Sequence, residues 1–472
     1  MAGNTEQTTF QRNTRKMKNR LLFYSFLFSL TAGAAAADPF DVEEKIKPVP
    51  QTEICSLNIK KEKLHLADVI NLALCRNPQT QKLYTGALAA AAEYGQTKAD
   101  YLPEISFNAG VSQSDTTAFG AHDSNAAAVS AGVSLNWLLY DFGGREASTE
   151  AVLQSLNTVL ATRSDTLQGL VFEAAEAYFQ VFAAKDEFDN ADAAVTSALA
   201  AYEAASKRYE LGLAALSDKL QAETALAQAQ LSVTKATETL SLAKGKLAVL
   251  LDFPPDQSLE LYEEPFPVSY LTVSNDVESL FAMALNNRSD IAAKKASIKQ
   301  AEASMEVQKA RNAPSLNLSA GLDGRKSLTD DGVRSHTSSV GLTLTVPLFT
   351  GFKNTYKVSQ SRYQLEQVKA ELKQLENNVR HEIWTSYHAF NTAKKTYEIS
   401  LTMLTSANQN AEVALGAYKA GKGSILNVLD AQSKLASARS AKTRSFYEVL
   451  IAKTNIIRKV GLIDPFQTNK GF

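Results

Sequence analysis

The sequence has little proline, little cysteine and almost no net charge. Its 472 residues include 12 prolines and 2 cysteines, and its formal net charge at pH 7 is −1. Because proline interrupts helices, its scarcity leaves room for very long ones. Because the charges nearly cancel, no basic field points to nucleic acid, and we expect no nucleic-acid partner.

The signatures of an active site are also missing. The sequence contains no nucleophile elbow and no glycine-rich phosphate loop. His381-Glu382-Ile383-Trp384-Thr385 lacks the second histidine of a zinc-binding helix motif. The histidines are scattered, at His65, His122, His336, His381 and His388. The sequence therefore predicts no catalysis, no cofactor and no metal site.

Residues 1–37 have the layout of a secretory signal peptide. Basic residues precede an apolar run over residues 21–30, and Ala35-Ala36-Ala37 fits a cleavage site before Asp38. The run is shorter than the ~20 residues of a spanning helix, which disfavours a membrane anchor. The start codon stays open between Met1 and Met17. We therefore expect an exported protein.

The cysteines are Cys55 and Cys75. In an exported protein, a pair of cysteines favours a disulfide, which here would tie the leading segment to the first helix. Two unpaired thiols are the alternative. A metal-binding pair is less favoured because no histidine or cysteine cluster accompanies them.

A tandem repeat organises the rest of the chain. Residues 209–229 return as residues 418–438, with Tyr418 matching Tyr209 at an offset of 209. In both copies a proline-free helical pattern meets one glycine, and a second helical pattern follows. Because glycine adopts the left-handed conformation that ends helices, we expect two long helical hairpins with tips near Gly212 and Gly421.

Each repeat also begins with a shorter helix, expected over residues 66–100 and 276–312. Proline-rich or irregular stretches separate the repeats from their surroundings. We divide the chain into an irregular lead-in (38–63), a first repeat (64–255), a linker (256–275), a second repeat (276–465) and a tail (466–472).

Between the short helix and the hairpin, the hydrophobic period changes from helical to alternating. Strands are predicted at about 104–117, 127–139, 315–324 and 337–348, each with one apolar and one polar face. The first two are joined by a loop of roughly a dozen residues. The repeat offset falls from 211 before the strands to 209 after them, and we expect the two lost residues in the strand connection. A hairpin covering a soluble core is the alternative.

The strands and long helices together predict an assembly. A helix of ~70 residues is ~105 Å long, more than a globular domain needs. Membrane barrels need about eight strands or more, and a sheet in lipid must close, so four strands per chain require oligomerisation. Three copies supply twelve strands. We expect a trimeric β-barrel in an outer membrane, continued by an α-helical tube in the periplasm.

The chain resembles the TolC-type outer membrane efflux proteins over nearly all of its mature length. The resemblance is carried by residues 73–78, 101–103 and 346–351 and by the two tips. It implies an outer membrane channel-tunnel of a Gram-negative bacterium, forming the exit duct of a tripartite system. The implied partners are a periplasmic adaptor protein and an inner membrane transporter, and the implied cargo is a secreted protein, a drug or a toxic ion. The signature around Cys75 resembles members that serve protein secretion.

The resemblance also implies roles for residues at the tips. Asp218 and Asp430 match acids that ring the periplasmic mouth of the family, and Asn427 stands where another acid is often found. Tyr418 matches a tip tyrosine with a basic partner, but Gly423 stands where that arginine is often found. We therefore expect a periplasmic gate held closed by fewer links than in other members.

The tips themselves are implied to contact the adaptor. The expected contact residues are Gly212, Leu213, Ser217 and Gly421. The competing interpretation is a non-channel coiled-coil protein that spans the periplasm as a structural tether. A tether would explain the long helices but not four alternating strands at equal places in two repeats.

Overall fold

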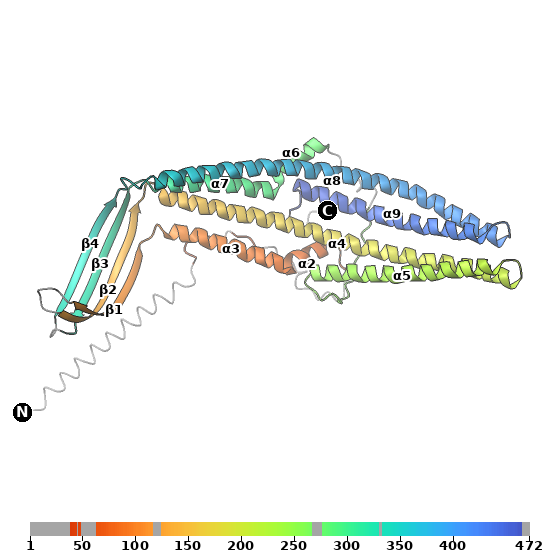
Figure 1. The fold of residues 1–472 in the computed structure, drawn as a ribbon, viewed down its shortest axis with the longest axis horizontal. Coiled ribbons are helices and arrows are strands. Elements are labelled where there is room, and N and C mark those ends of the chain that lie inside the picture. Colours follow the sequence, from red (N-terminus) through yellow and green to blue (C-terminus); the bar gives the residue numbers. More distant parts are fainter. Residues whose placement is uncertain are drawn as a thin grey trace, which may run out of the picture.

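The computed structural model describes residues 38–44, 46–48, 63–116, 124–266, 276–329 and 333–464. The expected signal peptide (1–37), Cys55 and the tail (466–472) lie outside these residues. Figure 1 shows a sheet at one end of a long bundle of helices, with two helical hairpin tips at the other end.

The described elements follow the same order in both repeats. The first repeat contains α2 (Leu66–Arg76), α3 (Pro78–Ala99), β1 (Glu104–Thr116), β2 (Ser124–Tyr140), α4 (Gly144–Glu210) and α5 (Leu216–Leu250). The second contains α6 (Val277–Asn287), α7 (Ser289–Ala310), β3 (Ser315–Ser327), β4 (Arg334–Thr345), α8 (Lys353–Lys419) and α9 (Ile425–Val460).

The expected continuous short helices are wrong in both repeats. Pro78 supplies no backbone donor and disfavours helical backbone at the residue before it, so Asn77 is extended at φ −59°, ψ 126°. The second repeat breaks at Arg288, which has φ −71°, ψ 128°, without a proline. Two helices of 11 and 22 residues replace each expected one.

The long helices are as the proline-free stretches predict. α4 and α8 each contain 67 residues. At about 1.5 Å per residue, each is ~100 Å long. The return helices α5 and α9 are shorter, with 35 and 36 residues. Each hairpin therefore pairs the tip-side half of its long helix with a shorter partner.

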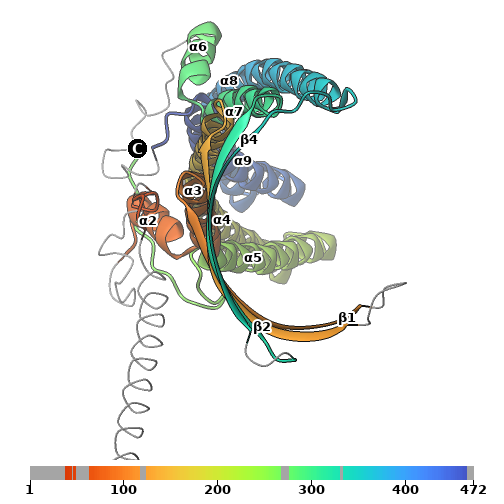
Figure 2. The same ribbon diagram turned by 90° about the vertical axis from the view of Figure 1, so that its left-hand side faces the viewer.

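The four strands form one antiparallel sheet in the order β1-β2-β3-β4. The register aligns the apolar residues of neighbouring strands: Phe107 faces Val133, and Val133 faces Leu322. The apolar alternations therefore lie on one face and the polar ones on the other. Figure 2 shows that the sheet is strongly curved.

The strand bounds differ from the predicted ones at several ends. β2 begins at Ser124, so seven residues separate it from Thr116 instead of about a dozen. The pairing also confirms the site of the deletion. Glu104 faces Asn136 in the first repeat, and Ser315 faces Thr345 in the second. The offset is thus 211 before the connection and 209 after it.

The two repeats share one large core in the middle of the bundle, built from residues of α2, α4, α6, α8 and α9 among others. The residues at the breaks between the short helices form hydrogen bonds to this part of the bundle. Asn77 donates to the carbonyl of Leu250 at 3.0 Å. Arg288, at the equivalent place, donates to the carbonyl of Lys459 at 3.1 Å and pairs with Glu382 at 3.0 Å. Each short helix is therefore fastened to the end of its own hairpin.

Among the described residues, none of the helices combines the length and the hydropathy needed to cross a bilayer.

Candidate functional site

Both hairpin tips end in the same backbone motif. Gly212 has φ +72°, and the Leu213 amide donates to the carbonyl of Arg208 at 2.7 Å. Gly421 has φ +75°, and the Lys422 amide donates to the carbonyl of Ala417 at 2.9 Å. These are the bonds of a Schellman cap, in which a left-handed glycine satisfies the last helical carbonyls. The prediction that these two glycines end the helices is confirmed.

Near the tips, the two hairpins pack against each other through a small apolar cluster. Its largest member is Tyr418, whose side chain is only 1% exposed. The remaining buried members come from both hairpins: Ala201, Ala205, Ala222, Ile425 and Val428. The small alanines let the helices approach closely. The position of one tip is thereby coupled to that of the other.

Arg208 of α4 links the first hairpin to the tip of the second. Its Nη1 donates to the carbonyl of Tyr418 at 2.7 Å, and its Nη2 donates to the carbonyl of Leu213 at 3.2 Å. Its guanidinium lies over the Tyr418 ring, 4.9 Å from the centroid. Tyr418 therefore has a basic partner in Arg208, although Gly423 stands where the family's arginine is often found. That the gate is held by fewer links than in other members stays a prediction. The contact joins residues 210 positions apart, which local sequence spacing could not show.

The hydroxyl group of Tyr418 is buried and forms no hydrogen bond in the described residues. Burial raises the pKa of Tyr418, the nearby charge of Asp218 raises it further, and Arg208 lowers it. Asp218 lies in the first turn of α5, where a carboxylate interacts favourably with the helix dipole. The structure thus brings Asp218, Arg208 and Tyr418 into one electrostatic group at the tip.

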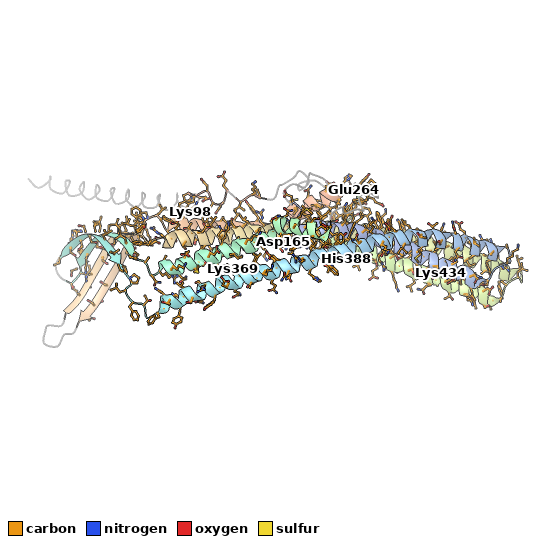
Figure 3. All side chains as sticks on the ribbon, turned by 90° about the horizontal axis from the view of Figure 1, so that it is seen from above. Lys98, Asp165, Glu264, Lys369, His388 and Lys434 are labelled. Atoms are coloured by element: carbon orange, nitrogen blue, oxygen red, sulfur yellow. The ribbon has the colours of Figure 1, made fainter. Side chains whose placement is uncertain are left out.

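Asp430 lies farther along α9 and has a partner of its own. Lys434 Nζ is 2.7 Å from Asp430 Oδ2, and both side chains are mostly exposed. Figure 3 shows Lys434 on the tip side of the helical bundle. Asn427 contributes its backbone amide to the cap formed by Ser424 Oγ, at 3.3 Å. In the described part of the chain, no hydrogen bond joins Asp218 to Asp430.

Sequence reasoning missed both basic residues. Lys434 follows Asp430 by four positions on a helix, a spacing that places them on one face and could have been recognised. Its charge offsets part of the negative charge that the resemblance implies at Asp430. No comparable sequence spacing indicates the contact between Arg208 and Tyr418.

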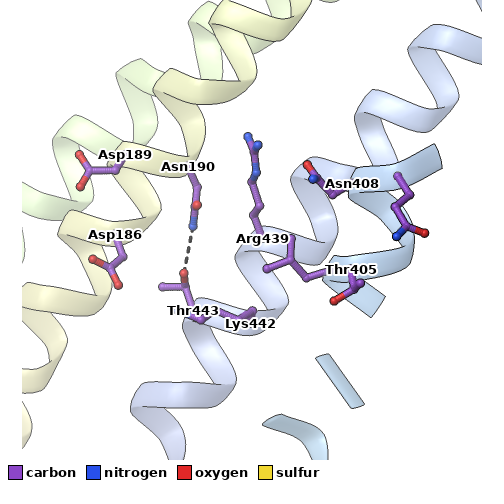
Figure 4. Close-up of a pocket in the computed structure, with 10 residues that line it drawn as sticks. Asp186, Asp189, Asn190, Thr405, Asn408, Arg439, Lys442 and Thr443 are labelled. Carbon is purple, nitrogen blue, oxygen red and sulfur yellow. Dashed lines mark hydrogen bonds between the residues drawn. The ribbon is translucent and has the colours of Figure 1, made fainter. Parts of the chain in front are cut away.

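A polar groove lies between the hairpins, closer to the middle of the bundle. It encloses about 630 Å³ and is lined by residues of α4, α8 and α9 (Figure 4). Asp186 and Asp189 line it on α4, and Arg439 and Lys442 line it on α9. Asn190 Nδ2 donates to Thr443 Oγ1 at 3.0 Å at its edge. Burial raises the pKa of Asp186, which accepts a hydrogen bond from the Tyr447 hydroxyl.

The sheet presents the second candidate surface. Large apolar side chains on one of its faces are exposed, including Ile105, Phe107, Val111, Leu322, Val340 and Leu342. Exposed apolar surface of this extent marks a membrane or protein contact. The opposite face carries small and polar residues, with Ser106 and Ser134 joined by their hydroxyl groups at 2.8 Å.

Cys75 is disulfide-bonded in the structure. Cys55, the chain's other cysteine, lies outside the described residues, so its pairing with Cys75 stays a prediction.

Known proteins share this arrangement. The chain is 27% identical to protein CyaE of Bordetella pertussis over 427 residues, which cover 89% of each chain. It is 24% identical to the outer membrane protein TolC of Vibrio cholerae over 431 residues, covering 86% of this chain and 93% of the relative. The solved CmeC outer membrane channel of Campylobacter jejuni aligns with a TM-score of 0.74 at 18% identity, covering 90% of this chain and 96% of that one.

The tandem hairpins and the curved sheet define the fold of an outer membrane channel-tunnel. The sequence model of the outer membrane efflux protein family matches residues 69–251 and 280–462, one match in each repeat. The chain belongs to this family. The resemblance seen in the sequence is confirmed, and so is the function class, the exit duct of an export system. The non-channel tether is not supported.

Proposed function

We propose that three copies of this chain form a twelve-stranded barrel in the outer membrane, continued by a tube of long helices. The observation that carries the proposal is the sheet. It is curved, its outer edges β1 and β4 are unpaired in the described residues, and one face is exposed and apolar. A sheet edge in lipid must be paired, and a neighbouring copy supplies the missing strand.

The tube ends at the hairpin tips, which we assign as the periplasmic gate. Arg208 and Tyr418 hold the two hairpins of one chain together, and this contact favours the closed arrangement. Asp218 and Asp430 supply carboxylates near the mouth, and Asn427 stands one turn from Asp430. Three copies of each carboxylate around a narrow passage would favour cations, because rings of like charge reinforce one another.

Docking of a periplasmic adaptor and an inner membrane pump would open this gate. The first tip exposes several leucines: Leu211, Leu213, Leu216 and Leu220. Leu213 is 64% exposed although it is apolar, which fits a surface that a partner covers. Ser217 lies beside these leucines in the first turn of α5, and Gly212 and Gly421 form the turns themselves.

The test of the barrel uses the two faces of one strand. Val340 is on the apolar face of β4 and is 80% exposed, whereas Thr343 is on the polar face. Arginine at the lipid face near the bilayer midplane costs about 2–4 kcal/mol per copy. Val340→Arg should therefore reduce SDS-resistant trimers in outer membrane fractions, and Thr343→Arg should not. Equal trimer yield from both variants, or a monomer of the wild type by light scattering, would contradict the proposed barrel.

A further inference from the structure

Two basic residues face each other at the far end of the sheet. Lys326 of β3 and Arg334 of β4 are Cα partners, and both side chains are exposed. His336 lies two residues beyond Arg334 on the same face and is also exposed. Like charges directly opposite on neighbouring strands destabilise a sheet unless something neutralises them.

The register places this pair on the apolar face. Val129 faces Lys326 on one side, just as Val133 faces Leu322. Arg325, the residue before Lys326, faces Ser335 and belongs to the polar face. In the proposed barrel, Lys326 and Arg334 therefore point toward lipid, and Arg325 points toward the lumen.

Their height along the strand matches a membrane surface. Lys326 follows Leu316 by ten positions, which is ~33 Å along a strand at ~3.3 Å per residue. A tilt of about 35–45° reduces this to ~25 Å, the height of the apolar band in outer membrane barrels. The long helices leave from the opposite end of the sheet (Figure 1), so the pair lies at the outer surface of the membrane.

Within the described residues, no ion pair joins a carboxylate to Lys326 or Arg334. We propose that this basic pair binds the phosphate groups of a phosphorylated glycolipid in the outer leaflet. Arginine binds phosphate oxygens in a bidentate manner, and lysine adds a second positive charge. His336 is placed to donate a further hydrogen bond. The inference rests on the proposed insertion of the sheet in the outer membrane.

The test compares three variants with the wild type. Lys326→Gln/Arg334→Gln removes the pair. Arg325→Gln removes one positive charge from the lumen face of β3, the strand that carries Lys326. Asp115→Asn removes an exposed acid from the same end of the sheet, on β1. The first measurement is the phosphorylated glycolipid retained per trimer after purification in mild detergent, by native mass spectrometry.

The second measurement is the shift in Tm when bis-phosphorylated lipid A, the dephosphorylated lipid or inorganic phosphate is added. Loss of the pair should weaken retention of the bis-phosphorylated lipid about tenfold or more, equivalent to at least one charge-assisted bond. The Arg325→Gln variant should retain the wild-type amount, and the acid variant should retain at least as much. Only the bis-phosphorylated lipid should raise the Tm.

Several results would overturn the inference. The first is that the pair variant retains as much lipid as the wild type, and the second is that Arg325→Gln loses as much lipid as the pair variant. The third is that the acid variant loses lipid. The fourth is that inorganic phosphate raises the Tm as much as the bis-phosphorylated lipid does. Single-channel conductance distinguishes a failure of the proposed lipid site from a failure of the proposed barrel. Variants that conduct as the wild type does but show one of these results refute the lipid site alone. A wild type that neither inserts nor conducts refutes the barrel on which the lipid site rests.

Discussion

Arg208 offers the sharpest test of the proposed gate. Its guanidinium joins α4 to the end of α8 through a 2.7 Å hydrogen bond to the Tyr418 carbonyl and through contact with the Tyr418 ring. Arg208→Ala removes both interactions, and Arg208→Lys keeps the charge but loses the fork that reaches two carbonyls. Lys207→Ala is the matched control, because it removes a neighbouring exposed charge from the same helix.

The expected magnitude follows from these contacts. A hydrogen bond from a charged donor contributes about 1.5–3 kcal/mol, and a partly exposed cation–π contact about 0.5–1 kcal/mol. Since Arg208 is only half-buried, we expect about 2 kcal/mol per chain. If three chains open together, the closed state loses about 6 kcal/mol, or about four orders of magnitude in the closed-to-open ratio.

The assay is single-channel conductance of purified trimers in planar bilayers. Wild type and Lys207→Ala should show the same low conductance, Arg208→Lys an intermediate increase, and Arg208→Ala the largest one. Tyr418→Phe should leave conductance unchanged, because the lost hydroxyl has no hydrogen bond. If Arg208→Ala forms stable trimers with wild-type conductance, the contact does not hold the gate, and the reasoning from these distances is refuted.

Three further predictions concern other charged or reactive groups. Asp430→Ala should weaken block of the channel by a trivalent cation. Lys434→Ala should strengthen this block, because Lys434 offsets the Asp430 charge. Equal block in both variants would contradict a role for Asp430. Burial, and then the charge of Asp290, raise the folded-state pKa of Asp165 above its unfolded value, so its ionised form lowers stability at neutral pH. Asp165→Asn should therefore raise Tm near pH 7, with the gain vanishing below about pH 4, where the carboxyl is protonated in both states; a gain that is the same at both pH values would exclude ionisation as its cause. Cys55 and Cys75 should give no free-thiol labelling in unfolded, unreduced mature protein, and two labelled thiols would exclude the disulfide.

Local patterns were enough to predict most of the architecture. A single glycine after a proline-free helix predicts each tip, because the left-handed turn depends on residues within one helical turn. Alternation predicts the strands, and keeping the apolar residues on one face excludes a register shifted by one residue. The break at Asn77 is also a local feature, because Pro78 disfavours helical backbone at the residue before it.

Contacts between distant segments could not be predicted in the same way. The break at Arg288 has no proline; its backbone is extended where its side chain bonds Glu382 and the Lys459 carbonyl. Those partners lie 94 and 171 residues away. Arg208 likewise meets Tyr418 only because two hairpins lie side by side. Helical periodicity identifies a face, but it does not specify which residue of another helix will meet that face.

The tandem repeat explains how such a contact can exist at all. Ala417 stands at the repeat position of Arg208, so the second tip has no matching arginine. Tyr209, the repeat counterpart of Tyr418, is 39% exposed, whereas Tyr418 is 1% exposed. In a ring of six identical hairpins, every tip would offer the same residues to both neighbours. Duplication within one chain makes adjacent tips different, so that one supplies the arginine and the next supplies the tyrosine ring and carbonyl. A link within each chain can then alternate with a separate contact between chains, and a partner that binds one kind of tip can release one kind of link.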